Sequence, residues 1–153
     1  MVSLCSNDAN FCNLSSSDIY FGVKMSTNGL SHVNLRANRE LLDKLKDFYC
    51  EIVGLHIGPR PPFPGFGYWL YAGDLAIMHL HITGPKEERL PNIISTIDHF
   101  AFICTNRNEF EEHLKLRGIE FQKVLVPMAN QVQLFIRDPA GNRVELNFAE
   151  NNV

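Results

Sequence analysis

The chain of 153 residues has no apolar run near the ~20 residues that a helix needs to cross a bilayer. Its first residues show neither the basic start nor the apolar stretch of a secretory signal. Basic side chains do not gather into a stripe, and 14 basic against 17 acidic residues give a formal charge of −3. We therefore expect no membrane and no nucleic acid as partner, and a cytoplasmic location.

The four cysteines contain no C-x-x-C pair. Cys5 and Cys12 lie in a polar leader, whereas Cys50 and Cys104 fall inside expected helices or strands. A disulfide framework is therefore not expected. Free cysteine is one of the most buried residue types, so we interpret Cys50 and Cys104 as small core residues.

The composition is that of one packed domain, because 45% of the residues are hydrophobic and 20% are charged. Residues 1–28 are rich in Ser, Asn and Asp and lack periodicity, so we predict a poorly ordered extension. There are two alternatives to this prediction: translation could start at Met25, or the leader could contain a short strand that docks on the domain. Residues 29–149 are predicted to form a single domain.

Two parts of this domain, residues 29–83 and 95–149, repeat the same order of elements. The first part predicts a strand, a helix between Asn38 and Gly54, a short strand, a Pro- and Gly-rich loop and a hairpin. The second part predicts the same order of elements, over residues 96–104, 108–117, 120–126, 132–137 and 143–148. The sequence therefore predicts an α+β fold of two βαβββ modules joined by a linker.

Each module begins with a histidine and ends with a second residue able to bind a metal. His79 follows His32 by 47 residues, and Glu145 follows His99 by 46 residues. Side chains alternate between the faces of a strand, and the apolar neighbours of these residues are expected to face the helices. All four candidate ligands then lie on the opposite face. If the two sheets curve toward each other, these faces enclose one cup that could hold a divalent metal.

Each candidate ligand also has an ordinary interpretation. A single histidine on a strand is more often solvated or hydrogen-bonded than bound to a metal. The carboxylate of Glu145 needs a cation or strong donors, and Arg143 or Arg36 could supply that charge without a metal. The matched positions in two modules favour the metal site.

Aromatic residues are expected beside the candidate ligands. Trp69 and Phe135 lie 66 residues apart, as do His79 and Glu145, so the two pairs occupy equivalent positions. Both aromatic side chains could line the cup or pack in the core. Phe66 and its loop could cover the mouth of the cup.

Several short segments carry a family resemblance: Leu30–Val33, Phe48–Tyr49 before Val53–Leu55, Asp98–Phe102 and Arg137–Leu146. With these segments the chain resembles the vicinal oxygen chelate superfamily, which includes glyoxalase, fosfomycin- and bleomycin-resistance and extradiol dioxygenase proteins. The resemblance covers about residues 29–149. It implies paired βαβββ modules that form a curved mixed sheet around a divalent metal.

The resemblance also implies roles for individual residues. His32, His99 and Glu145 occupy metal-ligand positions, and His79 occupies the fourth, where glyoxalase I enzymes usually carry a Glu that also acts as base. His79 or His81 is the expected catalytic residue that moves a proton. The expected substrate-binding residues are Trp69, Phe135, Arg137 and Phe66.

The ligand set leaves the chemistry open. Two histidines and one carboxylate suit non-haem iron and dioxygen, whereas the set with His79 added suits zinc, nickel, manganese or cobalt as a Lewis acid. We predict a metal-dependent enzyme that acts on a small, oxygen-rich substrate. Lyase or isomerase chemistry is favoured over extradiol ring cleavage, because this chain has two modules whereas many dioxygenases have four. A metal-free drug-binding protein of the bleomycin-resistance type is the alternative.

The expected assembly is a homodimer. Members of the superfamily pair their modules within one chain or exchange them with a second copy, and the sequence does not choose between the two arrangements.

Overall fold

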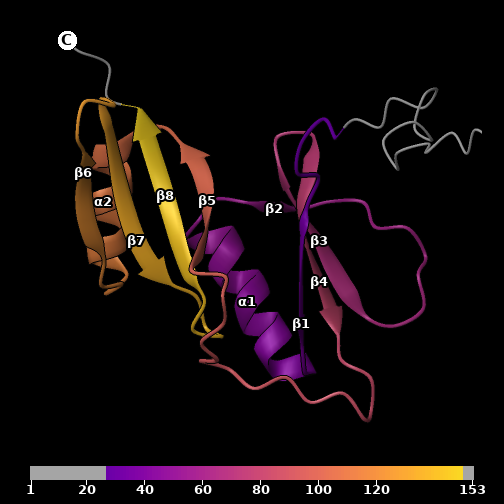
Figure 1. Ribbon diagram of the computed structural model, residues 1–153. Coiled ribbons are helices and arrows are strands. Elements are labelled where there is room, and N and C mark those ends of the chain that lie inside the picture. Colours follow the sequence, from indigo (N-terminus) through magenta and orange to yellow (C-terminus); the bar gives the residue numbers. More distant parts are fainter. Residues whose placement is uncertain (1–26, 150–153) are drawn as a thin grey trace, which may run out of the picture. The chain divides into compact units, whose positions relative to one another are not determined.

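The computed structural model describes residues 27–149, which contain two helices and eight strands. Module one consists of β1 (Val33–Ala37), α1 (Arg39–Glu51), β2 (His56–Ile57), β3 (Gly67–Ala72) and β4 (Leu75–Ile82). Module two consists of β5 (His99–Cys104), α2 (Arg107–Leu116), β6 (Gln122–Val126), β7 (Gln131–Arg137) and β8 (Arg143–Ala149). The predicted α+β fold of two βαβββ modules is confirmed (Figure 1).

The eight strands form two four-stranded sheets, with the orders β1-β4-β3-β2 and β5-β8-β7-β6. The first strand of each module runs parallel to its last strand, and the other neighbours are antiparallel. As a result, β1 and β5 each lie at an edge of their own sheet (Figure 1).

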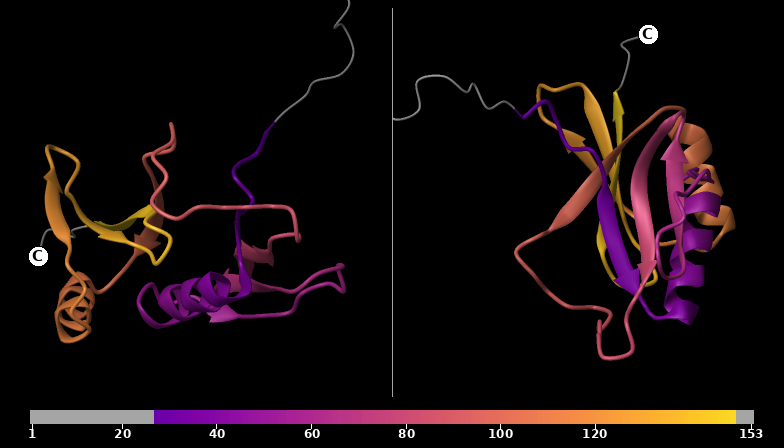
Figure 2. Two further views of the ribbon diagram at one scale, coloured as in Figure 1. Left: turned by 90° about the horizontal axis from the view of Figure 1, so that it is seen from below. Right: turned by 90° about the vertical axis from the view of Figure 1, so that its right-hand side faces the viewer.

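Helix α1 covers one face of the module-one sheet (Figure 2). The side chain of Asn38 caps its first turn by accepting a hydrogen bond from the amide of Leu41 at 3.0 Å. One side of the helix is apolar and buried, through Leu42, Leu45, Phe48 and Tyr49. The apolar rows of the sheet pack against this side, so the opposite face is left for polar residues.

Helix α2 covers the module-two sheet with fewer buried residues. Leu114 is its fully buried residue, and the ring of Phe110 meets Phe148 of β8 edge to face at 5.4 Å. The sheet supplies most of this core, because alternate residues of β8 are buried at Val144, Leu146 and Phe148. These three residues face the helix, as their alternation predicts.

Contacts between the modules involve the end of α1 and the turn between β7 and β8. The hydroxyl of Tyr49 donates a 2.8 Å hydrogen bond to the buried carboxylate of Asp138. The same carboxylate accepts hydrogen bonds from the backbone amides of Ala140 and Asn142, each at 2.9 Å. The turn of residues 138–142 therefore also fastens module two to α1.

The chain divides into two units, residues 1–30 and 31–153, and every helix and strand of the described residues belongs to the second unit. The predictions for most of the leader, including Cys5 and Cys12, fall outside the described residues. Cys50 and Cys104 are free thiols, half-buried against the core. The described helices are too short and too polar to span a membrane.

Candidate functional site

The first half of the candidate site consists of His32 and His79, which we call half-site one. His79 lies in β4 beside Asn34 of the parallel strand β1, and His32 lies just before β1. The two imidazole rings stack with their centroids 4.0 Å apart and their planes at 25°. The structure therefore brings together the two candidate ligands of module one.

Half-site one continues into a row of aromatic rings. The indole of Trp69, opposite His79 on β3, stacks on its imidazole at 3.9 Å with the planes within 2° of parallel. The ring of Phe63 follows, 6.2 Å from Trp69. We call Phe63, Trp69, His79 and His32 the aromatic row.

His79 is the most constrained member of this row. Burial, and then the neighbouring His32, lower the pKa of His79 below its ordinary value. Its Nε2 atom is buried and has no hydrogen-bond partner among the described residues. A neutral, unpartnered imidazole nitrogen in this position is suited to bind a metal or to accept a proton.

The second half of the site consists of His99 and Glu145, which we call half-site two. His99 Nε2 lies 3.0 Å from Glu145 Oε2, and the Glu145 residue is only 3% exposed. The amide groups of Gln133 and Asn147 each donate a 2.8 Å hydrogen bond to Glu145 Oε1. The buried carboxylate thus accepts hydrogen bonds from two neutral donors and also contacts the histidine.

Asp98 contacts half-site two at Nδ1 of His99, the ring nitrogen that does not face Glu145. Its carboxylate lies 2.6 Å from His99 Nδ1 and accepts a 2.9 Å hydrogen bond from Arg143. The hydrogen bond with His99, and then Arg143, lower the pKa of Asp98. Such a carboxylate behind a histidine orients the ring and raises its basicity toward a metal.

Neither arginine considered for Glu145 pairs with it. Arg143 binds Asp98 and places its guanidinium 3.9 Å from the centre of the Phe135 ring. Arg36 instead forms an ion pair with Glu87 in the linker between the modules. A charge partner from these two side chains therefore does not explain the burial of Glu145.

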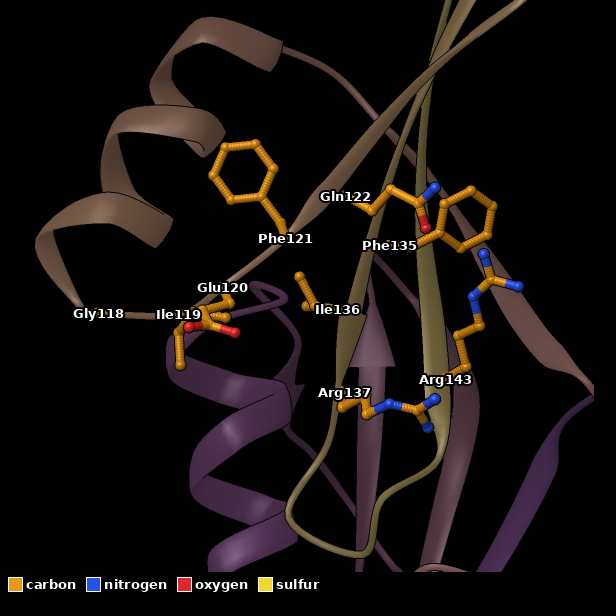
Figure 3. Close-up of a pocket in the computed structure, with 9 residues that line it drawn as sticks. All are labelled: Gly118, Ile119, Glu120, Phe121, Gln122, Phe135, Ile136, Arg137 and Arg143. Carbon is orange, nitrogen blue, oxygen red and sulfur yellow. The ribbon is translucent and has the colours of Figure 1, made fainter. Parts of the chain in front are cut away.

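A pocket of about 540 Å³, which we call the module-two pocket, adjoins half-site two through Phe135, whose ring lies 5.4 Å from that of His99, but neither His99 nor Glu145 lines it. Phe135 and Arg137, both predicted to bind substrate, line it together with Gln122 and Arg143 (Figure 3). Phe135 lies opposite Glu145 in the β7–β8 register, just as Trp69 lies opposite His79. The equivalence that we deduced from the 66-residue spacing is therefore present in the strand register.

A second pocket of about 520 Å³, the module-one pocket, opens beside half-site one. Trp69 and His81 line it, whereas Phe66 lines neither pocket and packs against Tyr68 and Arg39. The residues that line the module-one pocket are His32, Asn34, Arg60, Phe63, Pro64, Trp69, His79, Leu80 and His81.

His81 differs from His79 because both of its ring nitrogens have neighbours. Nε2 lies 3.1 Å from the carbonyl oxygen of Pro64, and Nδ1 lies 3.2 Å from Arg36 Nη1. Nδ1 also lies 2.9 Å from the carbonyl oxygen of Ile82. A proton on Nε2 lets the ring donate to Pro64 and accept from Arg36, whereas a proton on Nδ1 lets it donate to Ile82. His81 is therefore placed to hold the loop, and it is less free than His79 to exchange a proton with a substrate.

The four candidate ligands form two pairs and not one cluster. Among residues 27–149 of a single chain, no group of three or more His, Cys, Asp or Glu side chains is close enough to hold a metal ion. The predicted cup with all four ligands is thus not assembled within this part of one chain.

Several residues of the site had not been identified from the sequence. Gln133 and Asn147 could have been found, because strand alternation places them on the same face as Glu145. Asp98 was visible as part of a motif, but its neighbour Arg143 depends on the pairing of β5 with β8. Arg60 lies in an irregular loop, for which the sequence has no period to follow, whereas Phe63 belongs to the loop of Phe66 that we expected to cover the mouth of the cup.

The model of the Glyoxalase/Bleomycin resistance protein/Dioxygenase superfamily matches residues 29–146. The chain belongs to this superfamily, and the resemblance inferred from its motifs is confirmed. No curated protein matches the chain.

Solved structures support the same fold. A glyoxalase family protein from Bacillus anthracis is 24% identical, with a TM-score of 0.63 over 84% of this chain and 100% of that one. A lactoylglutathione lyase from Agrobacterium tumefaciens is 21% identical, with a TM-score of 0.58 over 80% and 95% of the two chains. A fosfomycin resistance protein from Listeria monocytogenes is 17% identical, with a TM-score of 0.57 over 80% and 94%. At these identities the likeness concerns the fold.

Proposed function

We propose that this protein is a metal-dependent lyase or isomerase that acts on a small organic substrate with two neighbouring oxygen atoms. Half-site one and half-site two together would hold one divalent metal. The observation that carries the proposal is the Nε2 atom of His79, which is buried in the wall of the module-one pocket and has no hydrogen-bond partner within residues 27–149. An imidazole nitrogen in this position becomes satisfied when a metal or a substrate binds.

The donors fit a divalent metal. Three imidazoles and one carboxylate are borderline to hard ligands, which suit zinc, nickel, manganese, cobalt or iron. His99 and Glu145 already lie 3.0 Å apart and are oriented by Asp98, Gln133 and Asn147. A divalent metal at this site would supply Lewis-acid stabilisation of the negative charge that develops on substrate oxygens.

In this proposal the side chains of the protein position the substrate and transfer a proton. His79 has a lowered pKa, so it is neutral at physiological pH and can accept a proton at Nε2. A lone pair on Nε2 that accepts a proton cannot bind a metal at the same time. His79 would therefore act as a metal ligand when Nε2 binds the metal and as a base when Nε2 is free of it. Trp69 fixes the ring of His79 by stacking, which keeps Nε2 directed at one position.

We further propose that a second copy of the chain completes the site, in a homodimer. The two half-sites lie in different sheets, and in the part of the chain that the structure describes β1 and β5 each have one edge that pairs with no other strand. The open face beside Glu145 also carries Ile103, which is 98% exposed in the isolated chain. Half-site one of one copy would face half-site two of its partner and cover this surface.

Elemental analysis of protein purified without chelators and without a histidine tag tests the proposal. Wild type should hold close to one zinc, nickel, manganese or cobalt ion per chain. Glu145→Ala should lose this metal, whereas Glu112→Ala, which removes an exposed carboxylate from α2, should keep it. Metal-loaded protein should then be assayed with hemithioacetals and with acids that can epimerise.

Two results would contradict the proposal. Stoichiometric iron, together with oxygen uptake on catechols, would replace it with ring-cleaving dioxygenation. No bound metal, and no uptake of any of these ions, would favour a metal-free binding protein of the bleomycin-resistance type.

A further inference from the structure

The module-one pocket has a chemical character that the metal ligands do not account for. It combines the aromatic row with one arginine, Arg60, on the loop between β2 and β3. We infer that this pocket binds the aromatic ring of an organic acid, with Arg60 on its anionic group. The inference names the substrate class of the proposed enzyme and in that sense rests on the proposed function.

The aromatic surface available to a ligand comes mainly from Phe63. One face of the Trp69 indole is covered by His79, whereas the Phe63 residue is 55% exposed. The two rings are tilted by 38° with their centroids 6.2 Å apart, so they meet at an angle along the pocket wall. A planar ring can contact such a surface face to edge, a geometry that adds to the free energy of simple apolar burial.

Arg60 supplies the charge. Its Nη2 donates to the carbonyl oxygen of Gly65 at 3.1 Å, and its guanidinium lies 6.0 Å from the centre of the Phe63 ring. Arg36, Arg39 and Arg143 all pair with carboxylates, but no described carboxylate forms an ion pair with Arg60. The remaining donors of its guanidinium are therefore available to an anion beside the aromatic wall.

The loop that carries both residues is held in place before any ligand binds. With a proton on Nε2, His81 donates to the carbonyl of Pro64, and Arg60 donates to that of Gly65. Gly65 has a φ of +84°, and a Cβ there would lie only 3.0 Å from His81 Cε1. Gly65 thus allows the loop to lie against His81, and the two hydrogen bonds hold it there with Phe63 and Arg60 on the wall of one pocket, so little ordering is required on binding.

Three small compounds separate the two parts of the inference. 3-Phenylpropanoate has the ring and the charge, 3-phenylpropanamide has the ring without the charge, and 3-cyclohexylpropanoate has the charge on a saturated ring. Trp69 is the single tryptophan of the chain, so its fluorescence reports binding at this pocket directly. Titrations should be made on the full-length protein with and without a chelator.

We expect 3-phenylpropanoate to bind about tenfold or more tightly than the amide, the effect of a charge-assisted hydrogen bond. It should bind about threefold to tenfold more tightly than the saturated acid. Arg60→Gln should remove the preference for the acid over the amide, and Phe63→Leu should remove the preference for the aromatic ring. Arg117→Gln, which changes an arginine paired with Glu51, should leave both preferences intact.

Equal affinity for the acid and the amide, or no change of Trp69 emission with any of the three compounds, would overturn the inference. Retained preferences in Arg60→Gln and Phe63→Leu would do so as well. Because the titration with chelator needs no metal, binding can be present when the metal analysis fails, or absent when it succeeds. The two failures are therefore distinguishable.

Discussion

Half-site one and half-site two occupy equivalent positions in two copies of one module, yet their ligands are held by different forces. In half-site one, His79 is fixed by stacking between Trp69 and His32, and its Nε2 has no polar partner among the described residues. In half-site two, Glu145 accepts hydrogen bonds from Gln133 and Asn147. Module one thus presents imidazole nitrogens on an aromatic wall, and module two presents a buried, hydrogen-bonded carboxylate.

This difference assigns the charge of the proposed site to module two. A cation attracted to the site would be drawn mainly by Glu145, because the candidate ligands of module one carry no negative charge. The aromatic wall of module one would instead provide an apolar surface for the substrate. The duplicated module has therefore produced two complementary halves and not two identical ones.

The largest expected effect is a loss of metal affinity when half-site two loses the charge of Glu145. Glu145→Gln keeps the size of the side chain and an acceptor for Gln133 and Asn147, but it removes the negative charge. Metal affinity, measured by competition with a chelator, should fall by more than about 100-fold, beyond what supporting residues cause. His79→Gln should reduce it less, since it removes a neutral donor. A larger loss in His79→Gln would reverse the proposed division of charge.

The next largest effect on metal affinity is expected from the residues that contact Nδ1 of the first histidine in each module. Asp98 contacts His99 Nδ1 at 2.6 Å, and the equivalent residue Ser31 contacts His32 Nδ1 at 3.1 Å. Asp98→Asn should lower metal affinity by about 10- to 100-fold, because the charged partner no longer orients and polarises the ring. Ser31→Ala is the matched control and should have a smaller effect. Equal losses in the two variants would show that the charge of Asp98 is unimportant.

A smaller effect is expected at the buried hydrogen bond between Tyr49 of module one and Asp138 of module two. Tyr49→Phe leaves the buried Asp138 without one of its donors, so the free energy of unfolding should fall by about 1–3 kcal/mol. Urea denaturation measures this change. Tyr68→Phe removes a half-buried hydrogen bond to Asp43 within module one and should cost less. If the two variants lose the same stability, the bond between the modules has no special weight.

The smallest effect is expected at Glu87, which ties the linker to Arg36 of β1. The hydrogen bond to Arg36 is the main cause that lowers the pKa of Glu87 from 4.5 to about 2. The folded state therefore keeps this carboxylate charged at a pH where the unfolded chain binds a proton, so its stabilising effect is lost as pH falls from 4.5 toward 2.

Glu87→Gln should accordingly be slightly less stable than wild type near neutral pH, and the difference should vanish in acid. Thermal melting of both proteins across this pH range measures it. A difference that does not change with pH would assign the effect to something other than the charge of Glu87. Metal affinity should not change, because Glu87 contacts neither half-site.

The sequence predicted the repeated elements well because their signals are local. Alternation of apolar residues in β8 and the cap at Asn38 both reappear in the structure. Stacking of His79 on Trp69 could be anticipated only in part, because the spacing gave the register but not the ring geometry. The support of Glu145 by Gln133 and Asn147 follows from the same alternation but was overlooked.

Other features depend on long-range structure. The positions of Phe63 and Arg60 are set by hydrogen bonds of an irregular loop to His81 and within itself. The separation of the candidate ligands into two pairs depends on how whole sheets are arranged, which no local pattern encodes. For that reason the sequence alone left open whether one chain or two complete the site.

The most direct test of the central claim uses two inactive chains. His79→Ala destroys half-site one and Glu145→Ala destroys half-site two, and the two variants are co-expressed with different affinity tags that bind no metal. In a heterodimer whose sites combine half-sites from both copies, one site is wild type and the other lacks both ligands. Heterodimer purified through both tags should hold about half the metal per chain of wild type. Recovered heterodimer with no more metal than either variant alone would contradict a site shared between two copies.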